Sequence, residues 1–430
     1  MQIPDVPPQL LAALVEAAAG QRLALVGGVV RDLLLHRHHQ DPWRGLPDLD
    51  LVVEGQAADL AARLPDALEQ QFGTLIPLRQ QPHGRFGTVE LELQLPQEFG
   101  GRWLVDLASA RREVYPEPAS NPVVSPGTLE QDLARRDVTV NAMALVLEPG
   151  GAAEVRLLDP HGGQADLAQR QLRFLHRDSL RDDPTRIVRA ARYAARLGFD
   201  LAPESLDQIS ATVSTWPWYW HLGDPPEAAP PALATRLRME MELLLIREPW
   251  QRALHFLKIW GALRLFDACL QEDDGWSRRL HWSRRLNLPI TVAAVATAGD
   301  PVGLGRRLQL PRHWIECLEA AINLCRLLID LNTYDQLASW KPSQWCSLLE
   351  GPDVGQEVVA LAVIMESRQR QILLHWWFCW RHVCSPVSAA ALLEEGWQQG
   401  PSLGAELRRL RFNAIDSKDV RPVKGLNLRE

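Results

Sequence analysis

The sequence lacks any stretch long and apolar enough to cross a membrane, and its first residues lack the features of a secretion signal. The stretch nearest to such a length is the short ILLHWWFCW at residues 372–380. A spanning helix needs roughly 20 such residues. The N-terminal MQIPDVPPQL has no basic segment followed by an apolar run, as a signal peptide would. We therefore expect a cytoplasmic protein that does not contact a membrane.

Cysteine is scarce, and the first half of the chain has none. The six cysteines are Cys269, Cys317, Cys325, Cys346, Cys379 and Cys384. No two of them form a CxxC pair, so zinc-finger chemistry is not expected. The pattern favours reduced cysteines that pack in the interior of a cytosolic protein.

The chain has no excess of positive charge, because its formal net charge is −7. The molecule as a whole is therefore not expected to attract nucleic acid. Residues 276–312 depart from this average, with seven arginines against one aspartate and the near-repeat WSRRLHWSRRL. Arginines interleaved with aromatics are typical of RNA-contacting surfaces. An amphipathic helix with buried tryptophans and solvated arginines explains the segment equally well, and the two interpretations are compatible.

What is present first is an α/β pattern, followed by a long helical remainder. The 430 residues suggest two to four domains. In the α/β part, over residues 21–110, the patterns predict strands at 22–26, 48–53 and 88–95, and a further strand within 102–110 that ends near Asp106. They predict helices at 29–36 and 56–72. Beyond residue 165 they predict helices at 184–199, 234–245 and 249–266, with the Pro-rich segment 216–233 as a linker. The expected fold class is α+β.

The strand in GLPDLDLVVEG, residues 45–55, carries two acids where a buried strand is expected. Side chains alternate along a strand, so Asp48 and Asp50 point to the same face. Two ionised carboxylates at that distance repel each other unless a cation lies between them. A divalent metal is the simplest such partner. Asp106, on the neighbouring strand, is a candidate third acid or an ordinary strand-end residue.

The segment LVGGVVRD places Gly27 and Gly28 between a strand and the start of a helix. Backbone N–H groups at such a helix start favour phosphate. Gly-Gly turns are common, so the motif alone is weak, and it lacks the third glycine of the dinucleotide fingerprint. With Arg31 and the acid pair nearby, however, it indicates phosphoryl or nucleotidyl transfer.

Two further segments carry candidate nucleotide contacts. In ARRDVTVNAMAL, residues 134–145, Asp137 and Asn141 would share a helical face suited to a ribose, while Arg135 and Arg136 can reach a triphosphate. The alternative is a surface turn before a core segment.

In RDDPTRIVRAARYAARLGF, residues 181–199, Asp183 is either a helix cap or one half of a pair with Arg186. Such a pair could read the Watson–Crick edge of a base, and Arg189 continues its stripe. The two roles exclude each other only if the hydrogen bonds of that carboxylate saturate.

These motifs in this order resemble the class II tRNA nucleotidyltransferase and bacterial poly(A) polymerase family. The resemblance runs over roughly residues 20–250. It includes VDLASARREVY, SPGTLEQDLARRDVTVNAMA, LLDPHGG and TRLRMEMELLL in addition to the motifs above. It implies a seahorse-like molecule with a polymerase-β-like nucleotidyltransferase head over residues 1–158. An elongated all-α remainder would comprise a neck (159–245), a body (246–335) and a tRNA-binding tail (336–430).

The resemblance also implies roles for individual residues. Asp48 and Asp50 would bind Mg²⁺ and act in catalysis with Asp106, as the 3′ hydroxyl of RNA attacks the α-phosphate of a nucleotide. The nucleotide-binding residues would be Gly27, Gly28, Arg31, Arg136, Asp137, Asn141, Asp183, Arg186 and Arg189. Of these, Asp183 and Arg186 match the pair that selects C or A without a template. Arg236, Arg238 and Glu240 match a neck motif that packs and orients that helix.

The partners implied are ATP, CTP and the 3′ end of tRNA. The segment ARREVYPEPASNPVVSPGTLEQDL, residues 110–133, resembles the flexible loop that A-incorporating members keep, which favours building or repair of the whole CCA end. Addition of A alone and poly(A) synthesis are the alternatives. A metal-dependent phosphohydrolase and a non-catalytic RNA-binding protein are more remote ones. The histidines of HRHHQD, residues 36–41, are expected in a solvated loop rather than a metal site.

Overall fold

The computed structural model describes residues 3–46, 48–83, 87–148, 155–216, 224–225, 228–333, 337–352, 354–365 and 368–417. The described residues fall into two compact units. Unit 1 comprises Met1–Trp220 and Pro230–Ala262, and unit 2 comprises His221–Ala229 and Leu263–Glu430. Part of the expected Pro-rich linker and the last residues of the expected tail, 418–430, lie outside the described residues.

Unit 1 is built around a mixed sheet, which has seven strands within the described residues, in the order β3-β4-β5-β2-β1-β8-β9. Its strands are β1 (Leu23–Val26), β2 (Leu49–Val53), β3 (Leu78–His83), β4 (Thr88–Gln94), β5 (Arg102–Ser109), β8 (Ala144–Leu147) and β9 (Val155–Leu158). Of the pairs between neighbouring strands, β2 and β5 run parallel, and the others run antiparallel.

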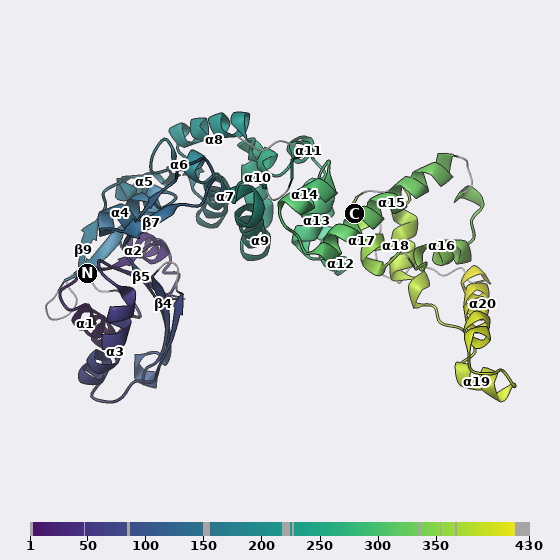
Figure 1. Cartoon of the computed structure of the whole chain (residues 1–430), viewed down its shortest axis with the longest axis horizontal. Coiled ribbons are helices and arrows are strands. Elements are labelled where there is room, and N and C mark those ends of the chain that lie inside the picture. Colours follow the sequence, from purple (N-terminus) through teal and green to yellow (C-terminus); the bar gives the residue numbers. More distant parts are fainter. Residues whose placement is uncertain are drawn as a thin grey trace. The chain divides into compact units, whose positions relative to one another are not determined.

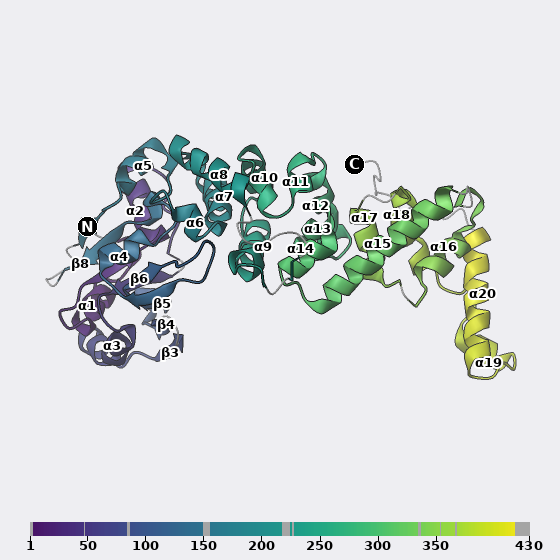
Figure 2. The ribbon, with the colours of Figure 1, turned by 45° about the horizontal axis from the view of Figure 1, so that its top comes forward.

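The helices of the head cover the sheet because their apolar side chains pack against the apolar side chains of the strands. Helices α1 and α3 pack on each other, and α3 also packs on β3, β4 and β5. The side chains of β1, β2 and β8 at Ala24, Val26, Val52, Ala144 and Val146 form a buried cluster with Leu129 and Leu133 of α4. Figure 2 shows the same arrangement from a second direction. The head elements outside the sheet are α1 (Pro8–Ala17), α2 (Gly28–His39), α3 (Ala57–Phe72), η1 (Gln97–Phe99), β6 (Arg111–Val114), β7 (Val123–Pro126), α4 (Leu129–Ala134) and η2 (Thr139–Asn141).

After the sheet, unit 1 becomes mainly helical, as expected. Its remaining elements are α5 (Gly163–Gln169), β10 (Gln171–Leu172), α6 (Ser179–Asp182), α7 (Thr185–Leu197), β11 (Asp200–Leu201), α8 (Pro203–Thr215), η4 (Ala232–Arg236), α9 (Leu237–Arg247) and α10 (Trp250–Ile259). The one helix predicted over 249–266 is interrupted. Gly261 has φ +70, a left-handed conformation that ends a helix, and a 3₁₀ turn, η5 (Ala262–Leu265), follows.

The described part of unit 2 is helical. Its helices are α11 (Ala268–Glu272), α12 (Trp276–Arg285), α13 (Ile290–Ala296), α14 (Pro301–Arg307), α15 (Arg312–Thr333), η6 (Leu337–Ser339), α16 (Pro342–Leu349), α17 (Gln356–Ile364), α18 (Arg370–Phe378), η7 (Trp380–His382), α19 (Ala389–Glu394) and α20 (Pro401–Ser417). No helix among the described residues is long and apolar enough to cross a membrane. The α+β prediction is therefore confirmed, and the finer division into head, neck, body and tail remains a prediction.

Three smaller expectations are resolved by the structure. The WSRRLHWSRRL segment forms α12, with Trp276 and Trp282 buried and Arg284 and Arg285 exposed, which confirms the amphipathic helix. The solvated loop predicted for HRHHQD is wrong in part, because residues 36–39 form the last turn of α2.

The interpretation of the cysteines also needs one correction. All six cysteines are free of disulfides, as expected. Cys269 and Cys384 are exposed, however, so interior packing does not describe them.

Candidate functional site

The three predicted acids meet on one face of the sheet. Asp48 immediately precedes β2, and Asp50 lies within it. The parallel pairing of β2 with β5 sets Asp50 directly opposite Asp106. Carboxylate oxygens of Asp48, Asp50 and Asp106 all lie within 4.8 Å of one another. The strand containing Asp106 continues to Ser109, so Asp106 is a mid-strand residue rather than the strand-end residue expected.

The electrostatics of this trio show what it lacks. Burial, together with the charges of Asp48 and Asp106, raises the pKa of Asp50 to about 6. Burial, Asp48 and Glu90 also raise the pKa of Asp106. Carboxylates crowded in this way resist ionisation until a cation neutralises them. Three carboxylate oxygens are a donor set that suits a hard divalent cation, so the trio fits a metal.

Gly27 links the trio to the start of helix α2. Its φ of +77 and ψ of −142 are open to glycine and strained for other residues. A Cβ at this position would lie 3.4 Å from Nη1 of Arg136 and 3.6 Å from Oδ2 of Asp50. The backbone therefore approaches both the acids and a guanidinium closely. Gly28 follows as the first residue of α2, where exposed N–H groups favour phosphate.

A cavity of about 780 Å³ opens beside these glycines within unit 1. Nine of the predicted residues line it, namely Gly27, Gly28, Asp50, Arg136, Asp137, Asn141, Asp183, Arg186 and Arg189. The cavity has both the charge and the size for a nucleotide. Asp48, Asp106 and Arg31 are not among its lining residues.

Arg31 is buried beside two residues that line the cavity, Gly28 and Asn141. Its Nη1 donates to Oδ1 of Asn141 at 2.7 Å, and its Nε and Nη2 donate to Asp32 at 2.9 and 3.0 Å. This arrangement holds Asn141 in place from behind. The helix considered for Asp137 and Asn141 does not form, because α4 ends at Ala134 and Asn141 lies in the 3₁₀ turn η2.

Asp183 lies just before helix α7 and holds four donors. Its Oδ1 accepts from N and Oγ1 of Thr185 at 3.0 and 2.6 Å, which is a local cap. Its Oδ2 accepts from Nη2 of Arg189 at 3.0 Å and faces Nη1 of Arg236 at 3.1 Å. Burial opposes ionisation, but Arg189 and Arg236 hold the pKa of Asp183 below its usual value. Of the about four acceptor positions of a carboxylate, three accept hydrogen bonds, and Arg236 adds an ion pair.

The guanidinium of Arg186 also forms hydrogen bonds within the protein. Its side chain is 2% exposed, and its Nη1 and Nη2 donate to the carbonyl oxygens of Ser179 at 3.2 Å and Arg135 at 2.8 Å. Its Nε has no hydrogen-bond partner within the described residues. Burial lowers the pKa of the neighbouring Arg189, yet the charges of Asp137, Asp183 and Glu240 outweigh it and raise that pKa.

Sequence reasoning missed several residues that the fold brings to the cavity. These are Arg111, Glu113, Tyr115, Asn121 and Tyr193, and Arg236 was expected only to orient a helix. Arg135, considered as a triphosphate contact, also lines the cavity. Tyr115 and Tyr193 are partly buried, and this burial, together with the charges of Glu113 and Asp137 respectively, raises the pKa of each to about 12. Most of the others belong to the expected flexible loop, which here begins and ends as the paired strands β6 and β7. The ARREVY segment was therefore a usable signal for three of them.

The chain is similar in sequence to a known head domain and to tRNA nucleotidyltransferases. Residues 23–173 match the model of the poly A polymerase head domain. The chain is 41% identical over 362 residues to the CC-adding tRNA nucleotidyltransferase of Deinococcus radiodurans, covering 81% of each chain. It is 35% identical over 261 residues to the A-adding tRNA nucleotidyltransferase of Aquifex aeolicus, covering 60% of this chain and 27% of that protein.

Solved structures agree on the fold. A CCA-adding enzyme in an apo form matches 96% of this chain, and 93% of its own chain is matched, with a TM-score of 0.68 at 22% identity. The match to the Aquifex protein is confined to about a quarter of that protein, whereas the Deinococcus match spans most of both chains. The chain therefore belongs to the family of tRNA nucleotidyltransferases, enzymes that share the poly(A) polymerase type of head domain.

Proposed function

We propose that the protein transfers CMP and AMP from CTP and ATP to the 3′ end of tRNA, without a template, and so builds or repairs the terminal CCA. The observation that carries this proposal is the meeting of Asp48, Asp50 and Asp106 at the edge of a nucleotide-sized cavity. The similarity to a CC-adding enzyme over most of both chains supports tRNA as the acceptor. The cytoplasm, where tRNA and both nucleotides occur together, is the proposed compartment.

In the proposed reaction, the 3′ oxygen of the RNA forms a bond to the α-phosphorus of the nucleotide. The bond from that phosphorus to the bridging oxygen breaks, and pyrophosphate leaves with the bonding electrons. Asp106 is positioned beside Asp50 to accept the proton of the 3′ hydroxyl, and its raised pKa suits a base. Mg²⁺ held by Asp48 and Asp50 would supply charge stabilisation of the developing oxyanions.

The nucleotide would be held by residues from both the head and the helices that follow it. The N–H groups at Gly27 and Gly28 and the guanidinium of Arg136 suit the triphosphate. Asp137 and Asn141 suit the ribose. A base that hydrogen-bonds to Asp183 would compete with the three hydrogen bonds and the Arg236 ion pair already on that carboxylate. Base selection in this protein is therefore a competition with Arg189 and Arg236.

A narrower activity, the addition of C alone, is favoured by one observation. The relative with 41% identity over 81% of each chain is a CC-adding enzyme. The A-adding alternative has support from relatives that match shorter stretches. The loop bounded by β6 and β7 resembles the element of A-incorporating members, so we retain complete CCA addition as the main proposal.

The test uses labelled CTP and ATP, separately and together, with Mg²⁺ and three tRNA transcripts ending at the discriminator base, at C or at CC. Label from both nucleotides on the shortest transcript supports CCA addition. CTP label alone identifies a CC-adding enzyme, and ATP label only on the CC-ended transcript identifies an A-adding one. Long A tracts on unrelated RNA would indicate a poly(A) polymerase. Absence of incorporation from either nucleotide would overturn the proposal.

A further inference from the structure

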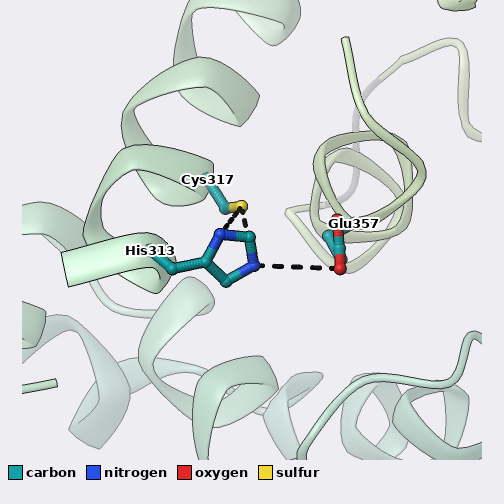
Figure 3. A group of neighbouring side chains, drawn as sticks. All are labelled: His313, Cys317 and Glu357. Carbon is teal, nitrogen blue, oxygen red and sulfur yellow. Dashed lines mark hydrogen bonds and ion pairs between the residues drawn. The ribbon is translucent and has the colours of Figure 1, made fainter. Parts of the chain in front are cut away.

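A second group of metal-ligating side chains lies in unit 2, where the acid trio has no member. His313 and Cys317 are one turn apart on helix α15, and Glu357 belongs to the first turn of α17. Figure 3 shows the imidazole of His313 between the thiol of Cys317 and the carboxylate of Glu357. Residues four apart on a helix present their side chains to the same side, a spacing that metal-binding helices use.

The distances in this group match those of a tetrahedral metal site. Nε2 of His313 lies 3.7 Å from Sγ of Cys317 and 3.8 Å from a carboxylate oxygen of Glu357. One ligand atom from each residue lies within 4.8 Å of the other two. Around a tetrahedral Zn²⁺ with ordinary bond lengths, such atoms are separated by about 3.4–3.6 Å. The three side chains therefore need to move by only a few tenths of an ångström at the two measured separations.

The frame that carries these ligands is held by packing. Helices α15 and α17 pack against each other. Leu318 and Ala321 of α15 are fully buried, as is Val359 of α17. Cys317 is itself only 7% exposed. The backbone positions of the three ligands are therefore set by the core, whether or not a metal is present.

The outer side of the group is open to solvent. The side chains of His313 and Glu357 are 59% and 47% exposed, which leaves an entry path and room for a water molecule as a fourth ligand. The neighbouring acid, Glu316, is engaged with Arg312 at 2.7 Å. That ion pair leaves Glu357 as the carboxylate that faces the imidazole.

We propose that His313, Cys317 and Glu357 form a binding site for a divalent cation of the Zn²⁺ class, which clips α15 to α17. One nitrogen, one thiolate sulfur and one carboxylate oxygen suit Zn²⁺ and disfavour Mg²⁺. The acid trio of unit 1 has the opposite preference, because it offers oxygen atoms alone. The two sites would therefore take different ions from the same solution. This proposal does not depend on the proposed nucleotidyl transfer.

The experiment uses the full chain, stripped with a chelator and kept under reducing conditions in excess Mg²⁺, so that the acid trio is occupied. Zn²⁺ is titrated against a chromogenic chelator, and Co²⁺ is added in a parallel sample. We expect one tightly bound Zn²⁺ per chain. We also expect a thiolate-to-cobalt charge-transfer band, which reports the Cys317 sulfur directly, and a higher melting temperature with Zn²⁺.

Matched variants separate this site from other thiols and acids. Cys317→Ser should abolish the cobalt band, and Glu357→Gln should weaken Zn²⁺ binding by roughly 100-fold. Cys325→Ser and Glu316→Gln change the same residue types on the same helix and should leave both readouts intact. Zn²⁺ binding equal in the wild type and Glu357→Gln, or a cobalt band that persists in Cys317→Ser, would overturn the proposal. If Cys317→Ser does not fold, Glu357→Gln, which alters a half-exposed side chain, still decides between the outcomes.

Discussion

At the scale of single residues, the carboxylate of Asp183 makes the local cap that its sequence position suggested, while its base-reading role remains a prediction. It caps helix α7 through Thr185 with one oxygen and holds Arg189 and Arg236 with the other. The second oxygen, Oδ2, is the one for which a base would compete with Arg189 and Arg236. Selection among bases then depends on how firmly the arginines hold it, as well as on the shape of the cavity.

Removal of Arg236 tests this dependence. Arg236 also donates to the carbonyl oxygens of Ala119 and Ser120 at 2.7 and 3.1 Å, so it ties Asp183 to the loop after β6. We expect Arg236→Ala to change the ratio of kcat/KM for CTP and ATP by about tenfold or more, which corresponds to the loss of one charged hydrogen bond. Arg238→Ala, at a residue that lies near Glu242 instead, is the control. An unchanged ratio in Arg236→Ala would contradict the competition.

Asp50 makes opposite contributions to activity and to stability. Asp50→Asn should reduce nucleotide incorporation by about 10³-fold or more, because the charge that holds the metal is lost. In the metal-free protein, the folded-state pKa of about 6 lies above the ordinary aspartate value of 3.8. A raised carboxyl pKa means stability that is present below the unfolded value and is lost as the pH rises through the folded one.

Metal-free wild type should therefore lose roughly 1–3 kcal/mol of unfolding free energy between pH 4 and pH 7 through this group. Asp50→Asn should escape that loss and be the more stable protein at pH 7.5. Urea unfolding in a chelator at several pH values measures the difference, with Asp59→Asn, at an exposed acid of α3, as the control. Equal pH dependence in Asp50→Asn and wild type would refute the assignment.

Gly27 and Gly20 provide a matched pair for the phosphate site. Both have positive φ, +77 and +84, so alanine should strain either backbone by about 1–2 kcal/mol. A Cβ at Gly20 meets nothing within 4 Å, whereas one at Gly27 meets Arg136 and Asp50. We expect similar losses of melting temperature, but a large rise of nucleotide KM only for Gly27→Ala. Equal effects on KM in the two variants would mean that backbone strain alone explains the rise of KM in Gly27→Ala.

At the scale of elements, the hairpin of β6 and β7 supplies one wall of the cavity. Its position depends on Glu113, which accepts from Arg111 at 3.0 Å, from Tyr115 at 3.1 Å and from Arg135 at 3.4 Å. The connection over residues 115–122 includes Tyr115 and Asn121 of the lining. The hairpin is therefore an ordered part of the site.

Replacement of residues 115–122 by a short Gly/Ser turn should reduce the incorporation of AMP more than the incorporation of CMP. We expect incorporation of AMP onto a CC-ended transcript to fall by about tenfold or more relative to incorporation of CMP, because the loop resembles the element of A-incorporating enzymes. Single-turnover assays with ATP on the CC-ended transcript and with CTP on the transcript that ends at the discriminator base provide the ratio of AMP to CMP incorporation. Circular dichroism controls for folding. Equal losses for CMP and AMP would assign the loop a general role in closing the cavity.

Local patterns predicted four of the seven described strands of the sheet, missing β3, β8 and β9, and predicted the contacts between elements poorly. Period two in DLDLV was enough to place Asp48 and Asp50 on one face, and the glycines marked the start of α2. The pairing of Asp50 with Asp106 depends on a register between strands more than 50 residues apart, which no local pattern contains. The inward turn of Arg31 toward Asn141 and the closure of Arg236 over Asp183 are likewise products of tertiary packing.

At the scale of the whole molecule, a net charge of −7 means that RNA binding has to depend on local groups of arginine. Helix α12 exposes Arg284 and Arg285 while its tryptophans are buried, and its RNA-contacting role remains a prediction. Arg284→Ala/Arg285→Ala should weaken tRNA binding and reduce the slope of log K against log salt by about 1–2. Arg156→Ala, at an exposed arginine of β9 that pairs with Glu148, should leave the slope unchanged. Equal slopes in all three proteins would exclude α12 as the contact.

The parallel pairing of β2 with β5 makes the acid trio a monitor of correct folding. A slip of one residue between these strands would turn Asp106 to the opposite face from Asp50, and the three carboxylates would no longer meet. Divalent cations present during refolding should then favour the native register, because that register alone among neighbouring ones assembles their ligands. Specific activity of a refolded sample would thus measure the fraction of molecules in which these two strands have aligned correctly.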